Sequence, residues 1–175
     1  MECIKNVKIS AIFKSVKPVL SFFNIAKTRK VSCEQKRNII VIKDFYTIII
    51  FQKPENEYHI NVTRIKSLSC IDKVIDWLIN TYCNTYCFQL VKYQIDNITA
   101  SFDLKQHICL QYLANSIKNS TYNPERFHAL YIKTSNGTAI IFQSGKVNIL
   151  GCSSIESVSS LWTLVQKKIN AALMQ

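Results

Sequence analysis

The sequence predicts an α+β fold in which two similar units share one antiparallel sheet, with the helices on one face. Two observations carry this prediction. Short segments recur at a nearly constant spacing, and each half reads in the same order of strand, helix, three-stranded meander and long helix. Two such units can join their meanders into one sheet whose apolar face is covered by the helices.

The repeat is visible in pairs of short segments. IKNV at Ile4–Val7 is matched by IDNI at Ile95–Ile98, and TIIIF at Thr47–Phe51 by TAIIF at Thr138–Phe142; both offsets are 91 positions (95 − 4 and 138 − 47). An ordered series of matches predicts a duplicated unit, with a first repeat at 1–85 and a second at 86–175. Two looser matches keep the same order: Lys36–Lys43 with Glu125–Lys133, and Trp77 with Trp162.

Hydrophobic periodicity predicts the elements of the second repeat. Asn136-Gly137 indicates a type I′ turn, Ser144-Gly145 indicates a second turn, and Ser153 or Ser154 can cap the last helix. The expected elements are a strand at Tyr93–Ser101, a helix at Gln106–Ser116, strands at Phe127–Lys133, Thr138–Gln143 and Lys146–Gly151, and a helix ending near Ala172.

The same reasoning gives the elements of the first repeat. They are a strand at Lys5–Phe13, a helix near Val16–Lys27, strands at Asn38–Lys43, Tyr46–Gln52 and Glu57–Val62, and a helix at Ser67–Tyr82.

The charge balance favours a polyanionic partner. The chain has 22 Lys and Arg residues against 11 Asp and Glu residues, a net charge of +11. Nucleic acid is the commonest partner of such a chain, although basic charge can also serve solubility alone. The sequence contains no long apolar run of membrane-spanning length and no signal-peptide core at its start, so we expect neither a membrane span nor secretion.

Cysteines and histidines show no catalytic or metal-binding pattern. The seven cysteines include no C-x-x-C pair, which argues against a zinc site and favours reduced, mostly buried thiols. The three histidines accompany no carboxylate cluster. We therefore expect no metal, no cofactor, no small-molecule substrate and no enzymatic activity.

Phe142 can be read in two ways. In the strand Thr138–Phe142, Ala139 and Ile141 point to one side, and Ile140 and Phe142 to the other. Phe142 is then either ordinary core or part of an apolar surface on the uncovered face. Proteins that insert aromatic wedges into the DNA minor groove have such a surface.

Three stretches of the second repeat resemble the TATA-box-binding protein family. They are IDNITASFDLKQHICLQYL (Ile95–Leu113), STYNPERFHALYIK (Ser120–Lys133) and IIFQSGKVNILG (Ile140–Gly151). The first repeat is similar to the family's N-terminal repeat more weakly, through IKNV, LSFFNIA, KRNIIVI and TIIIF.

The resemblance implies a saddle with pseudo-two-fold symmetry, in which a curved ten-stranded sheet sits on the minor groove and four main helices on the convex face meet other transcription factors. In the family the matching residues have these roles: Phe127 and Phe142 form the wedge, Asn97 and Asn6 donate to bases, and Lys146 faces phosphate. The implied DNA-binding positions are Asn6, Ile49, Phe51, Asn97, Thr99, Phe127, Ile140, Phe142, Lys146, Asn148 and Leu150, and the implied partner-binding positions are Asn123, Glu125 and Arg126.

Several positions depart from the family pattern. Asn38 stands where the first repeat should carry a wedging phenylalanine. Lys8 and Thr99 replace small apolar groove contacts, Asn148 replaces a valine and Leu150 a threonine. Asn123 and Arg126 replace acidic and apolar residues offered to a general factor B. These departures mean that the resemblance does not by itself imply strict TATA preference, the full bend or the usual partner contacts, and they suggest a divergent paralogue, a parasite protein or a viral protein.

Three functions follow. The first is a nuclear, or viral, initiation factor that binds promoter DNA and recruits general factors A and B and RNA polymerase. The second is an interaction platform that keeps the saddle without sequence-specific DNA binding. The third, an enzyme domain, lacks any catalytic pattern. Affinity for A·T-rich against G·C-rich duplex at fixed salt separates the first two.

Overall fold

The computed structural model describes residues 3–15, 22–83 and 88–174. Within them the chain forms four α-helices and one ten-stranded sheet, in the order β2-β3-β4-β5-β1-β6-β10-β9-β8-β7. The neighbouring strands from β2 to β1 in this order, and those from β6 to β7, pair antiparallel. The predicted α+β class and ten-stranded antiparallel sheet are confirmed.

The five strands of each repeat have the same order when counted inward from the two ends of the sheet, β2-β3-β4-β5-β1 from one end and β7-β8-β9-β10-β6 from the other. The first set of elements is β1 (Cys3–Ser15), α1 (Phe22–Thr28), β2 (Ser32–Lys36), β3 (Ile39–Lys43), β4 (Thr47–Gln52), β5 (Glu57–Ile65), a 3₁₀ turn η1 (Leu68–Cys70), α2 (Ile71–Leu78) and a π-helical turn η2 (Ile79–Cys83). The second set is β6 (Phe88–Asp103), α3 (Leu110–Ser116), β7 (Ser120–Asn123), β8 (Phe127–Thr134), β9 (Gly137–Phe142), β10 (Lys146–Cys152) and α4 (Ile155–Leu173).

Contacts along the chain divide it into two compact units. The N-terminal unit is Asn6–Asp96, and the C-terminal unit is Met1–Lys5 together with Asn97–Gln175. The division falls inside β6, whose 16 residues pass from one unit to the other. The repeats at 1–85 and 86–175 were predicted from matching sequence segments and not from contacts. That the two repeats superpose stays a prediction.

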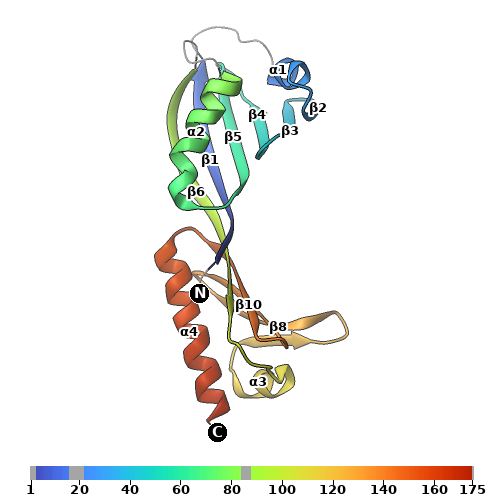
Figure 1. Cartoon of the computed structure of the whole chain (residues 1–175), viewed down its shortest axis with the longest axis vertical. Helices are drawn as coiled ribbons and strands as arrows, with labels where there is room; N and C mark the ends of the chain where they lie inside the picture. Colours follow the sequence, from blue (N-terminus) through green and yellow to red (C-terminus); the bar gives the residue numbers. More distant parts are fainter. Residues whose placement is uncertain (1–2, 16–21, 84–87, 175) are drawn as a thin grey trace. The chain divides into compact units, whose positions relative to one another are not determined.

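Each unit buries one face of its strands beneath its long helix. Val7, Ile9 and Ala11 alternate with partly exposed residues on β1, and Ile98 and Ala100 do the same on β6. Figure 1 shows α2 in front of the strands of one unit and α4 alongside β10 in the other, where it contacts β9 and β10. The helices α2 and α4 fill the core with these buried side chains: Ile71, Val74, Ile75 and Leu78, and Val158, Leu161, Val165, Ile169 and Ala172.

The last helix follows its sequence signals closely. Ser154, one of the two predicted caps, accepts a hydrogen bond on its Oγ from the backbone N–H of Ser157 at 3.2 Å. Glu156 lies in the first turn, where an acidic side chain suits the helix dipole. No helix in the described ranges is long and apolar enough to cross a membrane.

Three local expectations were wrong. Neither β2 nor β7 was expected as a strand, and α3 begins at Leu110 rather than at Gln106. The turn between β8 and β9 consists of Ser135 and Asn136, because Thr134 pairs with Gly137. Neither turn residue has a positive φ, so the turn is not type I′. The predicted helix near Val16–Lys27 falls partly outside the described residues; its described part is α1.

The cysteines are less uniformly buried than expected. Cys83 and Cys152 are buried, and burial raises the pKa of the Cys83 thiol to about 12. Cys33 and Cys70 are partly exposed, and Cys109 is exposed. Cys87 lies outside the described residues.

Gly145 sets the β9–β10 turn that carries Phe142 and Lys146. Its φ is +82°, and a Cβ there would lie 2.1 Å from the backbone oxygen of Gln106. Gly151 has a similar φ of +81°, but the nearest atom to its Cβ would be 3.7 Å away. We therefore expect Gly145→Ala to lower the free energy of unfolding by roughly 3 kcal/mol and Gly151→Ala by about 1 kcal/mol. Urea unfolding of both variants measures this difference. Equal losses of unfolding free energy would show that a Cβ at position 145 does not collide with Gln106.

Candidate nucleic-acid interface

The C-terminal unit presents a mixed apolar and polar face on the side of its strands away from the helix. Ile141 is fully buried, whereas Ile140 and Phe142 beside it are partly exposed, so Phe142 lies on the uncovered face. We call this surface the C-terminal open face. Its half-exposed residues are Asn97, Thr99 and Ser101 of β6, Ile140 and Phe142 of β9, and Asn148 and Leu150 of β10.

An aromatic cluster occupies one part of this face. The ring of Phe127 meets the ring of Phe142 edge to face, with 6.2 Å between centroids, and is 45% exposed. The ring of Tyr131 lies 5.7 Å from that of Phe127. The two phenylalanines were predicted from the sequence, and Tyr131 was not, although its spacing on β8 places it on the same side of the strand as Phe127.

Two asparagines of the C-terminal open face have their oxygens occupied. Asn97 Oδ1 accepts from the backbone N–H of Gly151 at 2.8 Å, and Asn148 Oδ1 accepts from Ser101 Oγ at 3.0 Å. An amide whose oxygen is held in this way keeps its N–H groups for another acceptor. The face therefore offers hydrogen-bond donors beside apolar groups.

Lys146 begins β10 and is exposed. It pairs across the sheet with Asp103. A backbone hydrogen bond from Lys105 lowers the pKa of the Asp103 carboxyl, and the nearby charges of Lys105 and Lys146 lower it further. The cation of Lys146 is thus at the edge of the face, beside an ionised carboxylate.

The predicted partner-binding residues lie at the end of β7 and in the turn that follows it: Asn123 is the last residue of β7, and Glu125 and Arg126 lie in the turn before β8. Asn123 Oδ1 accepts from the backbone N–H of Glu125 at 3.2 Å, and the Asn123 carbonyl accepts from the N–H of Arg126 at 3.2 Å. The Asn123 side chain therefore shapes its own turn. Glu125 and Arg126 are exposed.

The N-terminal unit has a corresponding face, which we call the N-terminal open face. Asn6 Oδ1 accepts from the backbone N–H of Arg64 at 2.7 Å, as Asn97 does from Gly151. Ile49 and Phe51 are half-exposed and alternate along β4 with the buried Ile48 and Ile50. Here the cross-strand partners of Phe51 are Ile39 and His59, and neither is a phenylalanine.

The β2–β3 hairpin explains this difference. Between the equivalent pairs Gln35–Ile40 and Tyr122–Leu130, it has four residues (36–39) where the β7–β8 hairpin has seven (123–129). The register sets Ile39 opposite Phe51, as Ala129 is opposite Phe142. The sequence suggested that Asn38 replaces a wedging phenylalanine. The register shows that Asn38 does not occupy the position equivalent to Phe127. The strand extension that carries Phe127 is missing from the N-terminal unit.

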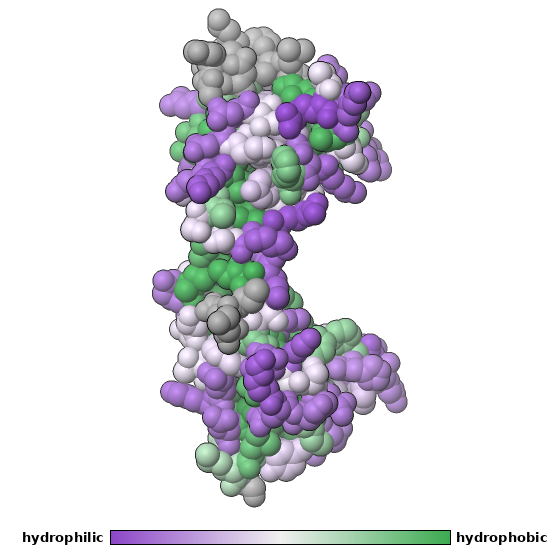
Figure 2. Space-filling model, in the orientation of Figure 1, coloured by the Kyte–Doolittle hydropathy of each residue, from purple (hydrophilic) through white to green (hydrophobic). Residues whose placement is uncertain are grey.

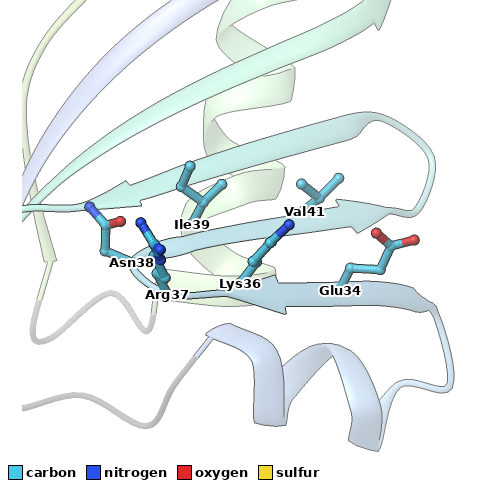
Figure 3. A pocket seen from close by; sticks show the side chains of 6 residues that line it. All are labelled: Glu34, Lys36, Arg37, Asn38, Ile39 and Val41. Atoms are coloured by element: carbon cyan, nitrogen blue, oxygen red, sulfur yellow. The ribbon is translucent and has the colours of Figure 1, made fainter.

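The shorter hairpin leaves a groove of about 590 Å³. Figure 3 shows Ile39 and Val41 on the same side of the strands as Glu34 and Lys36, with Asn38 at the hairpin end. The Asn38 side chain donates to the carbonyl of Gln52 at 3.4 Å. The groove is apolar at its floor and charged at its rim.

The face of each unit that is visible in Figure 2 is largely hydrophilic. Figure 2 shows hydrophilic side chains over much of the visible surface of both units, with smaller hydrophobic patches among them. The net charge is +7 for residues 1–87 (14 basic, 7 acidic) and +4 for residues 88–175 (8 basic, 4 acidic). Both halves of the chain therefore attract polyanions.

Sequence comparisons find the family suggested by these features. Residues 92–172 match the family model for Transcription factor TFIID (or TATA-binding protein, TBP). A TATA-box-binding protein of Thermoplasma volcanium is 36% identical over 83 residues, which are 46% of this chain and 45% of the relative. The TATA-box-binding protein-like 1 of Entamoeba histolytica is 37% identical over 70 residues, 39% of this chain and 32% of the relative. The chain thus matches about half the length of the archaeal relative.

The structural comparison extends to nearly the whole chain. Methanococcus jannaschii TBP superposes with a TM-score of 0.76 and 21% sequence identity, over 97% of this chain and 98% of that one. At this identity the match establishes the fold. Residues 92–172 therefore match the TATA-binding protein family in sequence, and the chain has the fold of Methanococcus jannaschii TBP along nearly its whole length.

Proposed function

We propose that this protein is a transcription initiation factor that binds and bends promoter DNA through the minor groove, mainly with its C-terminal open face. The observation that carries the proposal is the cluster of Phe127 and Phe142, with ring centroids 6.2 Å apart, on a face lined with amide donors. Apolar side chains that insert between base pairs kink DNA in this way.

The chemistry of the C-terminal open face suits A·T base pairs. In the minor groove these pairs offer only the acceptors adenine N3 and thymine O2, to which Asn97 and Asn148 can donate. They carry no amino group that would obstruct Ile140 and Leu150. We propose that Asn6, Ile49 and Phe51 of the N-terminal unit also contact the minor groove, but contribute less to the binding affinity. Thr99 would contact the groove beside Asn97.

The similarity to the TATA-binding protein family also supports the proposal that this protein binds other components of the transcription machinery. We propose general factors of the A and B type and RNA polymerase as partners, acting at promoters in the nucleus or at a viral transcription site. Factor B would meet the turn that contains Asn123, Glu125 and Arg126. The first test is affinity for A·T-rich against G·C-rich duplex at fixed salt, with tighter binding to A·T expected.

A second candidate function is an interaction platform that keeps the fold without sequence-specific binding. It is favoured by the N-terminal open face, where Lys8 Nζ lies 3.0 Å from Asp96 Oδ2 and a carboxylate faces the side that DNA would occupy. Equal, weak affinity for both duplexes would favour the platform.

DNA binding should weaken steeply as salt rises, because Lys and Arg side chains displace counterions from phosphates. Lys146→Ala should reduce the slope of log affinity against log salt by about one unit. Lys167→Ala is the matched control, since Lys167 is exposed on the helix α4 rather than on an open face. Fluorescence anisotropy over a salt series gives both slopes. An unchanged slope for Lys146→Ala would show that Lys146 does not contact a phosphate.

The turn at Asn123 should select its own factor B. We expect a standard eukaryotic factor B to form little ternary complex on A·T-rich DNA, because Arg126 places a cation where the family has an apolar residue. Arg126→Leu should raise the yield, whereas Lys133→Leu, which removes a cation from the same strand pair, should not. A mobility-shift assay measures the yields. A full ternary complex with the unmodified protein would show that the turn substitutions are silent.

A further inference from the structure

An ion pair lies on the N-terminal open face, two residues along β1 from Asn6. Lys8 Nζ lies 3.0 Å from Asp96 Oδ2, and the side chain of Asp96 is 19% exposed, against 35% for that of Lys8. Ser10 Oγ donates to the same carboxylate oxygen, and Gln94 Nε2 donates to the other at 3.1 Å. Asp96 therefore accepts hydrogens from three side chains on the face that is proposed to bind DNA.

The Asp96 carboxylate is ionised at neutral pH and fixed in place. Partial burial raises the pKa of Asp96, but the hydrogen bonds from Ser10, Gln94 and Lys8 outweigh it, and the pKa lies below its usual value. Two of these donors are on β1 and one is on β6, so the carboxylate cannot turn away from Lys8 without breaking charge-assisted hydrogen bonds. The charge of Lys8 is thus neutralised where it lies.

Two other cations on this face are freer than Lys8. Lys14 Nζ lies 4.0 Å from Glu57 Oε2 with 56% of its side chain exposed, and the ring of His59 also contacts Glu57. Lys92 is exposed and lines an open groove of about 220 Å³ on this face. Exposed ion pairs contribute little in water, so Lys14 can exchange Glu57 for a phosphate. The ion pair of Lys8 is more buried, and its carboxylate has further donors.

The equivalent serine of the C-terminal unit has a different partner. Lys8 and Ser10 correspond to Thr99 and Ser101 by the repeat offset of 91 (99 − 8 and 101 − 10). Ser101 Oγ donates to Asn148 Oδ1, an uncharged amide oxygen, at 3.0 Å. The N-terminal open face therefore differs at these positions by one cation and by the carboxylate that cancels it.

We infer that Asp96 limits DNA binding by the N-terminal open face, because it neutralises Lys8, which would otherwise contact DNA. The inference rests on the proposed binding to DNA. Lys8 is two residues from Asn6 on the same strand, so a duplex that meets Asn6 also meets this ion pair. Phosphates attract the ammonium and repel the carboxylate, and the pair has no net charge. Without the charge of the carboxylate, Lys8 displaces one further counterion from DNA.

Asp96→Asn should steepen the slope of log affinity against log salt by about one unit on an A·T-rich duplex. The substitution keeps the shape of the side chain and one oxygen for Gln94 or Ser10. A slope of about 0.9 per cation corresponds to roughly eightfold tighter binding at 0.1 M salt, and the gain should vanish towards 1 M salt. Asp76→Asn is the control, because it removes the same charge from an exposed position on α2, on the helix side, and should leave the slope nearly unchanged.

Lys8→Gln tests the same ion pair from the other side. It leaves the Asp96 anion on the face without a cation, so the slope should flatten by about one unit and binding should weaken roughly eightfold at 0.1 M salt. Fluorescence anisotropy gives the slopes, and urea unfolding shows whether each variant is folded. Unchanged slopes for both variants, or equal changes for Asp96→Asn and Asp76→Asn, would overturn the inference and leave the proposed function intact if the unmodified protein prefers A·T-rich DNA. Failure of the unmodified protein to bind DNA would overturn both.

Discussion

Phe142→Ala is expected to remove most of the DNA bend and to weaken DNA binding by about 30-fold, which corresponds to about 2 kcal/mol. Phe142 and Phe127 present two rings in contact on the C-terminal open face. Unstacking one base step costs a few kcal/mol, and two adjacent rings can occupy the space that opens. Removal of one ring leaves a gap beside the other.

Phe51→Ala should have a smaller effect, about fivefold in affinity and little in the bend. Phe51 is opposite Ile39 on a hairpin that lacks the strand extension of its counterpart, so its ring has no aromatic companion on that strand. Energy transfer between dyes at the two duplex ends measures the bend for both variants. Equal losses would mean that both units kink DNA alike, and no loss from Phe142→Ala would show that this ring does not enter the DNA.

Lengthening the β2–β3 hairpin should add a second kink. In this variant the sequence NPERFHA, residues 123–129, replaces residues 36–39, so that a phenylalanine extends the strand beside Phe51 as Phe127 does beside Phe142. We expect a larger bend and about tenfold tighter binding, because the groove of about 590 Å³ at this hairpin becomes occupied by a ring.

A second graft, NPERAHA, is the matched control. It gives the hairpin the same length and the same charge, without the ring. If both grafts change the bend equally, hairpin length alone matters and the missing ring is not the cause. If neither changes the bend although both unfold like the unmodified protein, the N-terminal open face does not kink DNA.

The elements with strong periodicity could be predicted from the sequence. The strand Thr138–Phe142 was predicted from its apolar run and the turns beside it, but the sequence left open whether Phe142 is core; in the structure Ile141 is buried and Phe142 partly exposed. The helix α4 has an apolar stripe and a capping serine, and it begins and ends within a residue or two of its predicted limits. Such features are local, so the sequence carries them directly.

Other features depend on partners distant in the sequence. The strands β2 and β7, SCEQK and STYN, are short and polar and lie at the two ends of the sheet order, so no periodicity marks them. The missing hairpin extension became visible only from the register of Gln35 with Ile40. The hydrogen bonds of Ser10 with Asn61 and Asp96 join three strands, and no short motif in the sequence predicts them.

The most direct test of minor-groove binding compares one A·T-rich duplex with the same duplex in which every A·T pair is replaced by inosine·C, and with a third that carries G·C. Inosine·C has the minor-groove acceptors of A·T and the major-groove pattern of G·C. We expect equal affinity for A·T and inosine·C at fixed salt and at least about tenfold weaker binding to G·C, because the amino groups obstruct the C-terminal open face. Binding of inosine·C as weak as that of G·C would place the protein in the major groove and contradict this account.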